Sequence, residues 1–297
     1  MKIAAFYAYH NLDRGWSCPI SLLNEFERMG HQVFHYNLYR LDENGNRIGN
    51  SDEELIKLID EQNQYDMMLH MDYGSFYSPL FSMIKIPKTI ELGDDPQAFN
   101  INYAKAMYFD FLFTPDKNCY NLYKKNGMNV IWLTHWADTN IHFPRQDIVP
   151  DKFIVTTCDE DRGNGLIKYL KANLDENIWL DDRFYYAADH SRFMCRGHIV
   201  FQKSKWGEIT RRPFEAAACK RMVMMDELNE NTGIYNIFRP NVDAVYYKNY
   251  KDALEKIEYY FNHLDEVKNI SENGYKVVIN GHTQTHRVKS LLKFWGY

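Results

Sequence analysis

The chain has 297 residues, more than one compact core usually holds, and we therefore expect two domains of ordinary size. Hydrophobic residues at 45% and charged residues at 25% are typical of a soluble globular protein, and no apolar run approaches the length that crosses a membrane. The formal net charge of −5 offers no general electrostatic attraction for nucleic acid or for an anionic membrane.

Segments typical of strands and helices alternate along the first half of the chain. We expect strands at 2–9, 31–38, 65–74, 87–96, 109–116 and 129–138. Helices are expected between them at 17–30, 54–62, 103–108 and 117–127. This alternation predicts a parallel sheet with helices on both faces.

The pattern pauses at 143–152, where Pro144 and Pro150 bracket a polar stretch, and then restarts. Strands are expected at the start of 153–165, at 198–204, at 222–227 and at the start of 243–264. Helices are expected at 166–174, 213–219, in the rest of 243–264, at 265–280 and at 282–297. We therefore predict a second α/β domain, with the division near residues 145–150.

The cysteines and the first residues bear on the location of the protein. Five cysteines are scattered along the chain without the spacing of a zinc or redox motif, at Cys18, Cys119, Cys158, Cys195 and Cys219. His10 and Asn11 end the apolar run at the start of the chain. The run is therefore too short for a signal peptide and is typical of a first strand. We expect reduced thiols in a cytoplasmic protein.

Two parallel sheets of this kind bind ligands at the carboxyl ends of their strands. The segment after the first strand supplies only Gly15, so the G-x-G-x-x-G of dinucleotide-binding domains is missing. The phosphate-loop motif G-x-x-x-x-G-K-[ST] and the G-x-S-x-G nucleophile elbow are missing as well. These absences argue against nicotinamide oxidoreductases, P-loop phosphotransferases and the commonest hydrolases of this class.

The segment 207–227, GEITRRPFEAAACKRMVMMDE, is the most informative stretch of the second half. Pro213 suits the first turn of a helix, and Glu215 falls in that turn. A glutamate there is favoured by the helix dipole and by capping alone, so a structural role and a ligand-binding role are both open at this point.

This segment and the end of the chain resemble the carboxyl-terminal domain of CgeB-like glycosyltransferases, which belong with the glycogen-synthase-like retaining families. The resemblance rests on an R-x-F-E that opens a helix, at Arg212, Phe214 and Glu215. It also rests on an H-T-x-x-x-R, at His282, Thr283 and Arg287. The segments 91–99, 109–127 and 130–144 resemble the amino-terminal domain of the same family, so the resemblance covers nearly the whole chain.

The resemblance implies a GT-B fold, in which two Rossmann-like domains face each other across a cleft. It implies an acceptor-side domain at 1–147, a nucleotide-sugar domain at 148–281, and a helix at 282–297 that packs back towards the first domain through Phe294 and Trp295. The donor is expected to be a nucleoside diphosphate sugar, most simply a UDP sugar, with Glu215 on its ribose and no further cofactor.

The sequence departs from the family pattern at two positions. Retaining relatives carry a second glutamate eight positions before Glu215, where this chain has Gly207, and Glu208 is one place out of register. A glycine usually follows the A-C of EAAAC, where this chain has Lys220. Retention and inversion of the anomeric configuration therefore both stay open.

A departing nucleoside diphosphate develops negative charge, which an enzyme without a metal ion meets with fixed cations. Suitable basic residues follow predicted strands of the second domain, at Arg162, Lys203, Lys205, Arg211 and Arg212. Each of them is as readily a solvated surface charge. A metal ion is not expected, since the nearest acidic cluster is Asp159–Asp161 in a loop.

The acceptor side of the reaction needs a carboxylate or another base near the acceptor hydroxyl. Asp94 and Asp95 directly follow a predicted strand and are the first choice, with His10, Asp13 and Asp72 as alternatives. The segment GDDP is equally compatible with a turn whose aspartates bond to their own backbone.

A different class of function also fits the sequence. The competing interpretation is a nucleotide-binding interaction or regulatory module that has lost catalysis, which the missing glutamate and Lys220 favour. For an enzyme, the acceptor stays open among a saccharide, a protein side chain, a metabolite and a modified DNA base. The oligomeric state is equally open.

Overall fold

A computed structural model describes residues 1–7, 18–37, 40–41, 47–48, 51–71, 78–150, 154–156, 165–174, 180–181 and 187–297. The chain divides into two compact units. The first unit is Met1–Thr134 with Gln284–Tyr297, and the second is His135–Thr283. The chain passes between them before His135 and after Thr283, so the division expected at 145–150 falls inside the second unit.

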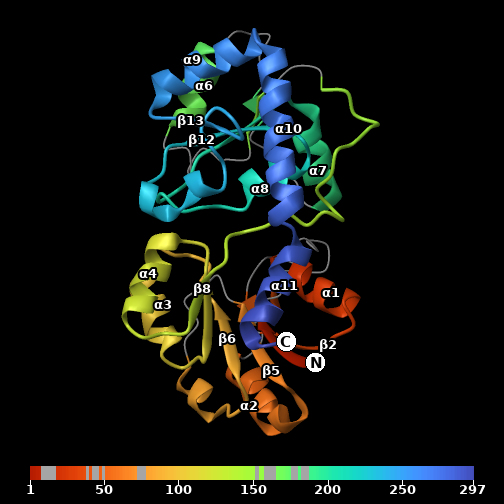
Figure 1. Cartoon of the computed structure of the whole chain (residues 1–297), viewed down its shortest axis with the longest axis vertical. Coiled ribbons are helices and arrows are strands. Elements are labelled where there is room, and N and C mark those ends of the chain that lie inside the picture. Colours follow the sequence, from red (N-terminus) through yellow and green to blue (C-terminus); the bar gives the residue numbers. More distant parts are fainter. Residues whose placement is uncertain are drawn as a thin grey trace. The chain divides into compact units, whose positions relative to one another are not determined.

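The first unit contains a sheet of parallel strands in the order β2-β1-β5-β6-β7-β8 (Figure 1). The strand bounds are β1 Lys2–Tyr7, β2 Gln32–Asn37, β5 Met67–Met71, β6 Lys88–Glu91, β7 Phe111–Thr114 and β8 Val130–Trp132. The central strands β1 and β5 are buried almost throughout, as apolar runs between two layers of helices are. A short antiparallel pair, β3 Arg40–Leu41 and β4 Arg47–Ile48, accompanies this sheet.

The helices of the first unit are α1 Cys18–Arg28, α2 Ser51–Glu61, α3 Phe99–Ala106, α4 Lys117–Lys125 and α11 Gln284–Trp295. The 3-10 turns η2 Gln62–Gln64 and η3 Pro79–Met83 follow α2 and β5. Although α11 comes from the end of the chain, it packs in this unit beside α1. Trp295 stacks on Phe26 with ring centroids 5.6 Å apart, and Phe294 meets Phe111 edge to face at 5.3 Å.

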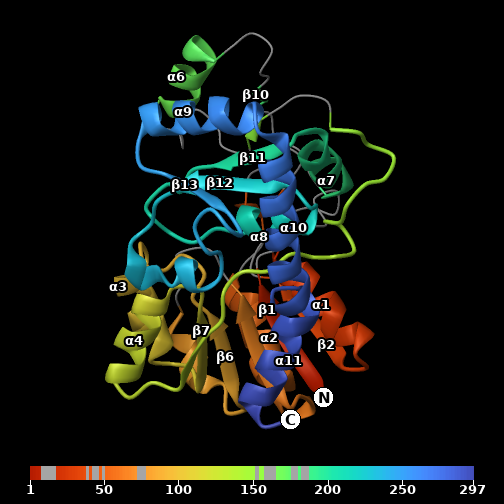
Figure 2. The same ribbon diagram turned by 45° about the horizontal axis from the view of Figure 1, so that its top comes forward.

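The second unit contains a parallel sheet in the order β10-β9-β11-β12-β13. Its strands are β9 Ile154–Thr156, β10 Leu180–Asp181, β11 Ile199–Gln202, β12 Met222–Asp226 and β13 Val245–Tyr247. Its helices are α6 Leu166–Asn173, α7 Ala187–Arg196, α8 Arg212–Ala218, α9 Tyr250–Phe261 and α10 Leu264–Gly281, with 3-10 turns η4 Glu230–Thr232 and η5 Ile234–Asn236. Figure 2 shows α6 and α9 on one side of this sheet and α8 on the other.

The core of the second unit joins the strands to these helices. Phe201, Met224 and Val245 of the sheet pack with Leu170 of α6 and Ile257 of α9. The buried residues come from neighbouring strands and from one face of each helix, because helical periodicity places every third or fourth residue on the same side.

The H-T-x-x-x-R residues fix the backbone where the chain changes units. In the second unit, the amide of Ala137 donates to the carbonyl oxygen of His282 at 3.0 Å. In the first unit, the buried guanidinium of Arg287 donates to the carbonyl and hydroxyl oxygens of Thr134, at 2.6 and 2.7 Å. Burial lowers the pKa of Arg287 to about 9. These roles are structural, and each lies within one unit.

The α/β class and the parallel sheets confirm the fold expected from the alternating pattern. One helix of the second unit, α7, is not indicated by the sequence pattern. Its apolar residues Phe193, Met194 and Cys195 are consecutive, and its other buried residues, His190 and Ser191, are polar. Hydrophobic periodicity detects spaced apolar residues and therefore misses such a helix.

Candidate functional site

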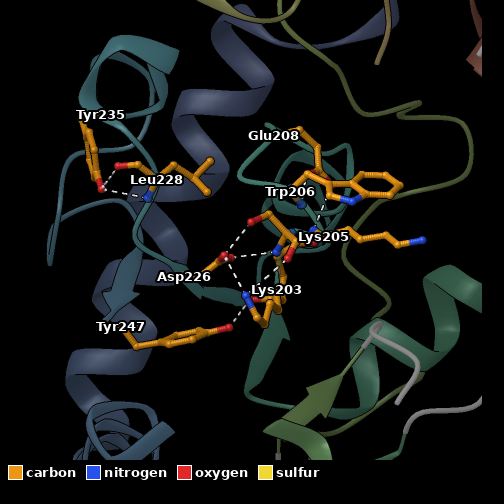
Figure 3. A network of polar contacts seen from close by, with 10 residues as sticks. Lys203, Lys205, Trp206, Glu208, Asp226, Leu228, Tyr235 and Tyr247 are labelled. Carbon is orange, nitrogen blue, oxygen red and sulfur yellow. Dashed lines mark hydrogen bonds and ion pairs between the residues drawn. The ribbon is translucent and has the colours of Figure 1, made fainter. Parts of the chain in front are cut away.

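The carboxyl ends of β11 and β12 are joined by polar contacts in the second unit (Figure 3). Asp226, the last residue of β12, accepts hydrogen bonds from the amide and hydroxyl of Ser204, at 2.8 and 2.5 Å. Its Oδ2 atom also lies 3.6 Å from Nζ of Lys203. Burial raises the pKa of Asp226, although these partners oppose the shift. The contacts hold the loop that follows β11 against the end of β12.

Glu208, in the same loop, accepts hydrogen bonds from the backbone of the loop. Its two carboxylate oxygens accept from the amides of Lys205 and Trp206, at 3.1 and 2.7 Å (Figure 3). Gly207 lies between Trp206 and Glu208 with a φ of +83°, a left-handed conformation in which a side chain is strained. The position eight residues before Glu215, at which the family resemblance implies a glutamate, therefore has a backbone that favours glycine.

The two lysines of this loop have different surroundings. Lys203 is largely buried and pairs with Asp226. Nζ of Lys205 lies 4.3 Å from the ring centroid of Trp206, a side chain that is 54% exposed. Lys203 is therefore part of the polar network, and Lys205 belongs to the exposed edge of the loop.

The hydroxyls of two tyrosines form hydrogen bonds with the backbone at the end of β11 and after β12 (Figure 3). The hydroxyl of Tyr247, the last residue of β13, donates to the carbonyl oxygen of Gln202 at 2.9 Å. The hydroxyl of Tyr235 donates to the carbonyl oxygen of Leu228 at 3.0 Å and accepts from its amide at 3.2 Å. The backbone at this edge of the sheet is therefore fixed by side chains as well as by strand pairing.

Helix α8 places Glu215 against the interior of the second unit. Pro213 is in its first turn, and Ala216–Ala218 are fully buried. Small residues allow close packing, and a Cβ atom at Gly274 of α10 would meet the carbonyl oxygen of Asp243 at 2.6 Å and the Cβ of Ala217 at 3.7 Å. This packing fixes the position of the helix that carries Glu215.

The helix ends in a Schellman motif. The amide of Lys220 donates to the carbonyl oxygen of Ala217 at 2.9 Å, and that of Arg221 donates to Ala216 at 3.1 Å. This motif needs a left-handed residue, and Lys220 adopts a φ of 58°. Its Nζ atom contacts a carboxylate oxygen of Glu272 at 2.5 Å.

Glu215 lies in a cluster of titratable side chains and is only 1% exposed. Its Oε1 atom is 3.7 Å from Nε of Arg211, whose guanidinium lies 5.3 Å from the ring centroid of Trp136. Burial raises the pKa of Glu215, but its electrostatic interactions with His142, Arg211 and their neighbours outweigh burial and hold that pKa below its usual value. The carboxylate is therefore ionised at neutral pH.

Two histidines complete this cluster. His142 follows a turn in which its amide donates to the carbonyl oxygen of Asp138 at 2.7 Å, and His190 lies on α7. Nε2 of His142 and Nδ1 of His190 are hydrogen-bonded at 3.2 Å. Burial lowers the pKa of both imidazoles, and that of His190 to about 4. Both rings are therefore neutral at neutral pH.

One ligand atom from each of His142, His190 and Glu215 can be chosen so that all three lie within 4.8 Å of one another. Nδ1 of His142 and Oε1 of Glu215 are buried and form no hydrogen bond within the described part of the chain. Arg212, the first residue of α8, is partly buried near this cluster and contributes to the low pKa of Glu215.

The aspartate pair of the first unit has a different arrangement. Asp94 is exposed, whereas Asp95 is 0% exposed. Asp95 accepts from Nδ2 of Asn102 at 2.9 Å and from the hydroxyls of Thr114 and Tyr123 at 2.8 and 3.3 Å. Burial raises the pKa of Asp95 to about 6. Its carboxylate joins α3, β7 and α4, so only Asp94 faces solvent.

Several residues singled out in the sequence lie outside the described residues. They are His10, Asp13, Asp72, Arg162 and the acidic cluster Asp159–Asp161. The structure brings Arg211 and Glu215 together, and it groups Lys203, Lys205 and Glu208 in the loop after β11. His142 and His190 were missed, because they are 48 positions apart and no spacing rule connects them. The only signal was that His142 falls in a segment that carries the family resemblance.

Comparisons with known proteins agree with this architecture. Residues 165–293 match a family model described as glycosyl transferase-like. A sucrose-phosphate synthase from Thermosynechococcus elongatus superposes with a TM-score of 0.72 at 10% identity, over 100% of this chain and 98% of that chain. HepE of Anabaena in complex with UDP-glucose gives a TM-score of 0.72 at 10% identity, over 100% and 99% of the two chains. The chain has a GT-B fold.

A glycosyltransferase from Rickettsia africae shares this GT-B fold, with a TM-score of 0.68 at 12% identity over 99% of this chain and 98% of that chain. A search of curated proteins finds no match to the sequence. Among the described residues, no helix is long and apolar enough to cross a membrane.

Proposed function

We propose that the protein is a glycosyltransferase that moves a sugar from a nucleoside diphosphate sugar, most simply a UDP sugar, to a hydroxyl acceptor. The observation that carries this proposal is the glycosyl transferase-like match over residues 165–293, which contains α8 and Glu215. HepE, which has the same fold, was solved in complex with UDP-glucose and with UDP. Metal independence, in the sense that no metal ion contacts the donor diphosphate, a cytoplasmic location and the CgeB-like assignment are parts of the same proposal.

The donor is bound in this proposal by the second unit. Glu215 accepts hydrogen bonds from the ribose hydroxyls, because its ionised carboxylate holds an oxygen without a hydrogen-bond partner in the described residues. Arg211 and Arg212 begin the same helix, and with Arg162 they supply positive charge for the diphosphate. Lys205 lies at the exposed edge of the neighbouring loop and contributes in the same way.

Lys203 and Glu208 shape the donor loop in this proposal. Lys203 neutralises Asp226, and Glu208 holds the amides of Lys205 and Trp206. These contacts keep the loop after β11 in one conformation, so that the cations near it need little reorganisation when charge develops on the leaving diphosphate. Both residues therefore act by positioning.

The acceptor is activated or held by the first unit. Asp94 is our candidate because it is the exposed member of the pair at the end of β6, and Asp95 positions it through three hydrogen bonds to its surroundings. His10 and Asp13 stay alternatives for the same task. An inverting enzyme would use such a carboxylate as the base.

The test is donor turnover with and without an acceptor. Purified protein should hydrolyse UDP-glucose or a related UDP sugar slowly without acceptor, as measured by UDP release. Glu215→Ala should weaken donor binding by about 1–3 kcal/mol, or about 5- to 150-fold, because ribose hydroxyls lose their partner. The exposed variant Glu255→Gln on α9 is the matched control. No turnover of any nucleotide sugar and no nucleotide binding would reject the proposal.

A second series tests the acceptor side. Asp94→Asn should reduce transfer by roughly a hundredfold or more while leaving donor affinity intact, if Asp94 is the base. Asp95→Asn, measured separately, should reduce it less. Equal transfer by both variants and the parent would place the base elsewhere, with Asp13 as the next variant.

The second candidate function is a nucleotide-binding module without catalysis. Two observations favour it. Glu208 is hydrogen-bonded to two backbone amides, and position 207, where the resemblance implies a second glutamate, is a glycine with a left-handed backbone. Neither residue therefore supplies the second carboxylate. The UDP-release assay separates the two functions. A module would bind UDP with the same dependence on Glu215 but would release none from a UDP sugar.

A further inference from the structure

The two buried histidines of the second unit are placed as metal ligands are. Their nitrogens, Nε2 of His142 and Nδ1 of His190, are 3.2 Å apart. Two nitrogens bound to one tetrahedral zinc ion at about 2.0–2.1 Å would be about 3.3 Å apart. Imidazole nitrogens at this separation share either a proton or a metal ion.

Glu215 supplies a third donor of a suitable kind. A set of ligand atoms from the three side chains fits within 4.8 Å, so the carboxylate has to approach by at most about 1.5 Å to reach zinc–ligand geometry. The three residues come from separate elements: the turn after Asp138, α7 and α8. Packing of those elements, rather than a flexible loop, brings the ligands together.

The three side chains of this cluster are buried, whereas most groups of polar residues lie on the surface. His142, His190 and Glu215 are 1%, 6% and 1% exposed. A buried polar atom without a hydrogen-bond partner destabilises the folded state, because it has lost its contacts with water. Nδ1 of His142 and Oε1 of Glu215 are two such atoms within the described residues, and a cation bound to the carboxylate would compensate for one of them.

We propose that His142, His190 and Glu215 bind one divalent first-row transition metal ion, most simply Zn²⁺, within the second unit. Two imidazoles and a carboxylate form a donor set that selects such ions over Mg²⁺ and Ca²⁺. The fourth position is taken by water. The ion ties the segment at 138–142 to α7 and α8 and fixes the orientation of the Glu215 carboxylate.

The guanidinium of Arg211 lies close to one of the proposed metal ligands. Its Nε atom lies 3.7 Å from Oε1 of Glu215, so the guanidinium and the metal ion compete for the same carboxylate. Removing that positive charge should therefore strengthen metal binding. The same change should weaken nucleotide binding if Arg211 serves the diphosphate, so the two measurements move in opposite directions.

The test is a titration of the metal-free full chain with ZnCl₂ by isothermal calorimetry, in competition with a chelator of known affinity. We expect one Zn²⁺ per chain and a rise in Tm on binding, with no competition from excess Mg²⁺. His142→Gln, His190→Gln and Glu215→Gln should each weaken binding tenfold or more. His263→Gln, an exposed histidine after α9, is the matched control and should bind as the parent does.

Arg211→Gln keeps the proposal testable if a ligand variant fails to fold. Its Zn²⁺ affinity should exceed that of the parent, and equal or weaker binding contradicts the assigned site. Cobalt(II) bound to the parent should show visible absorption bands of a low-coordinate site and no thiolate charge-transfer band in the near ultraviolet. Such a band would assign the metal to cysteines and overturn the proposal.

The inference does not rest on the proposed transferase function. Both assign the same Oε1 atom of Glu215, so bound Zn²⁺ should weaken UDP binding by the parent, but the two proposals still fail separately. Zn²⁺ binding that depends on His142 and His190 supports the metal site even if no nucleotide binds. Zn²⁺ affinity that is the same in the parent and in all three ligand variants overturns the site, whatever the result of the UDP-release assay.

Discussion

The two units each contain a fully buried carboxylate, and the surroundings of the two are opposite. Asp95 of the first unit is held by an amide and two hydroxyls, all neutral, and burial raises its pKa to about 6. Glu215 of the second unit lies among two histidines and two arginines, which hold its pKa below the usual value. One carboxylate is satisfied locally, whereas an oxygen of the other has no hydrogen-bond partner within the described residues.

Burial alone therefore does not identify a functional carboxylate. Neutral donors that saturate a carboxylate join elements of structure, as Asp95 joins α3, β7 and α4. Cations around a carboxylate that lacks hydrogen bonds keep it ionised and able to bind a further group. We therefore propose a structural role for Asp95 and a binding role for Glu215.

The largest expected effect comes from truncation of Asp95. Asp95→Ala leaves the donors of Asn102, Thr114 and Tyr123 without their acceptor and should lower the free energy of unfolding by about 4 kcal/mol. Asp95→Asn keeps an acceptor in place and should unfold close to the parent. Urea denaturation at pH 7 measures both. Equal stability of the Ala variant and the parent would remove the structural role from Asp95.

The pH dependence of stability gives a similar but smaller effect. The folded protein binds a proton on Asp95 near pH 6, whereas the ordinary pKa is 3.8. Lowering the pH from 7 to below 4 therefore stabilises the folded state at this site, by about 3 kcal/mol for the full shift. The gain begins near pH 6 and is complete below the ordinary pKa.

Asp95→Asn isolates this contribution from the other titrating groups. The difference in unfolding free energy between parent and variant should change in favour of the parent as the pH falls from 7 to 4. A constant difference across that range would contradict the raised pKa and, with it, the contrast between the two carboxylates.

The smallest expected effect is at the end of the helix that carries Glu215. Lys220 holds a left-handed backbone that favours glycine, so Lys220→Gly should stabilise the protein by about 0.5–1 kcal/mol, less the loss of its contact with Glu272. Thermal unfolding measures the change. UDP affinity should stay the same, because Lys220 has no part in the binding cluster. A parallel loss of affinity would mean that helix stability, and not the Glu215 carboxylate, controls binding.

The sequence predicted much of the fold because its apolar residues are spaced regularly. The buried runs of β1 and β12, the proline at the start of α8 and the alternating elements all carry local signals. Helix α7 had no such signal, since its buried face includes His190 and Ser191. Periodicity reads apolar spacing and cannot anticipate a buried polar face.

The candidate site was predicted less completely for a related reason. Glu215 and Arg211 are close in the sequence, so a helical turn brings them together. His142 and His190 reach Glu215 only through packing of three separate elements, which no local pattern encodes. Likewise, GDDP marked Asp94 and Asp95 equally, and only the partners on α3, β7 and α4 distinguish the buried one from the exposed one.

The most direct test is a side-by-side measurement of UDP affinity by isothermal calorimetry for the parent, Glu215→Gln and Asp95→Asn. Both variants remove one buried negative charge and keep the shape of the side chain. The contrast between the units predicts a loss of about 5- to 150-fold for Glu215→Gln and no change for Asp95→Asn. Equal affinities in all three proteins, with both variants folded, would contradict the binding role of Glu215.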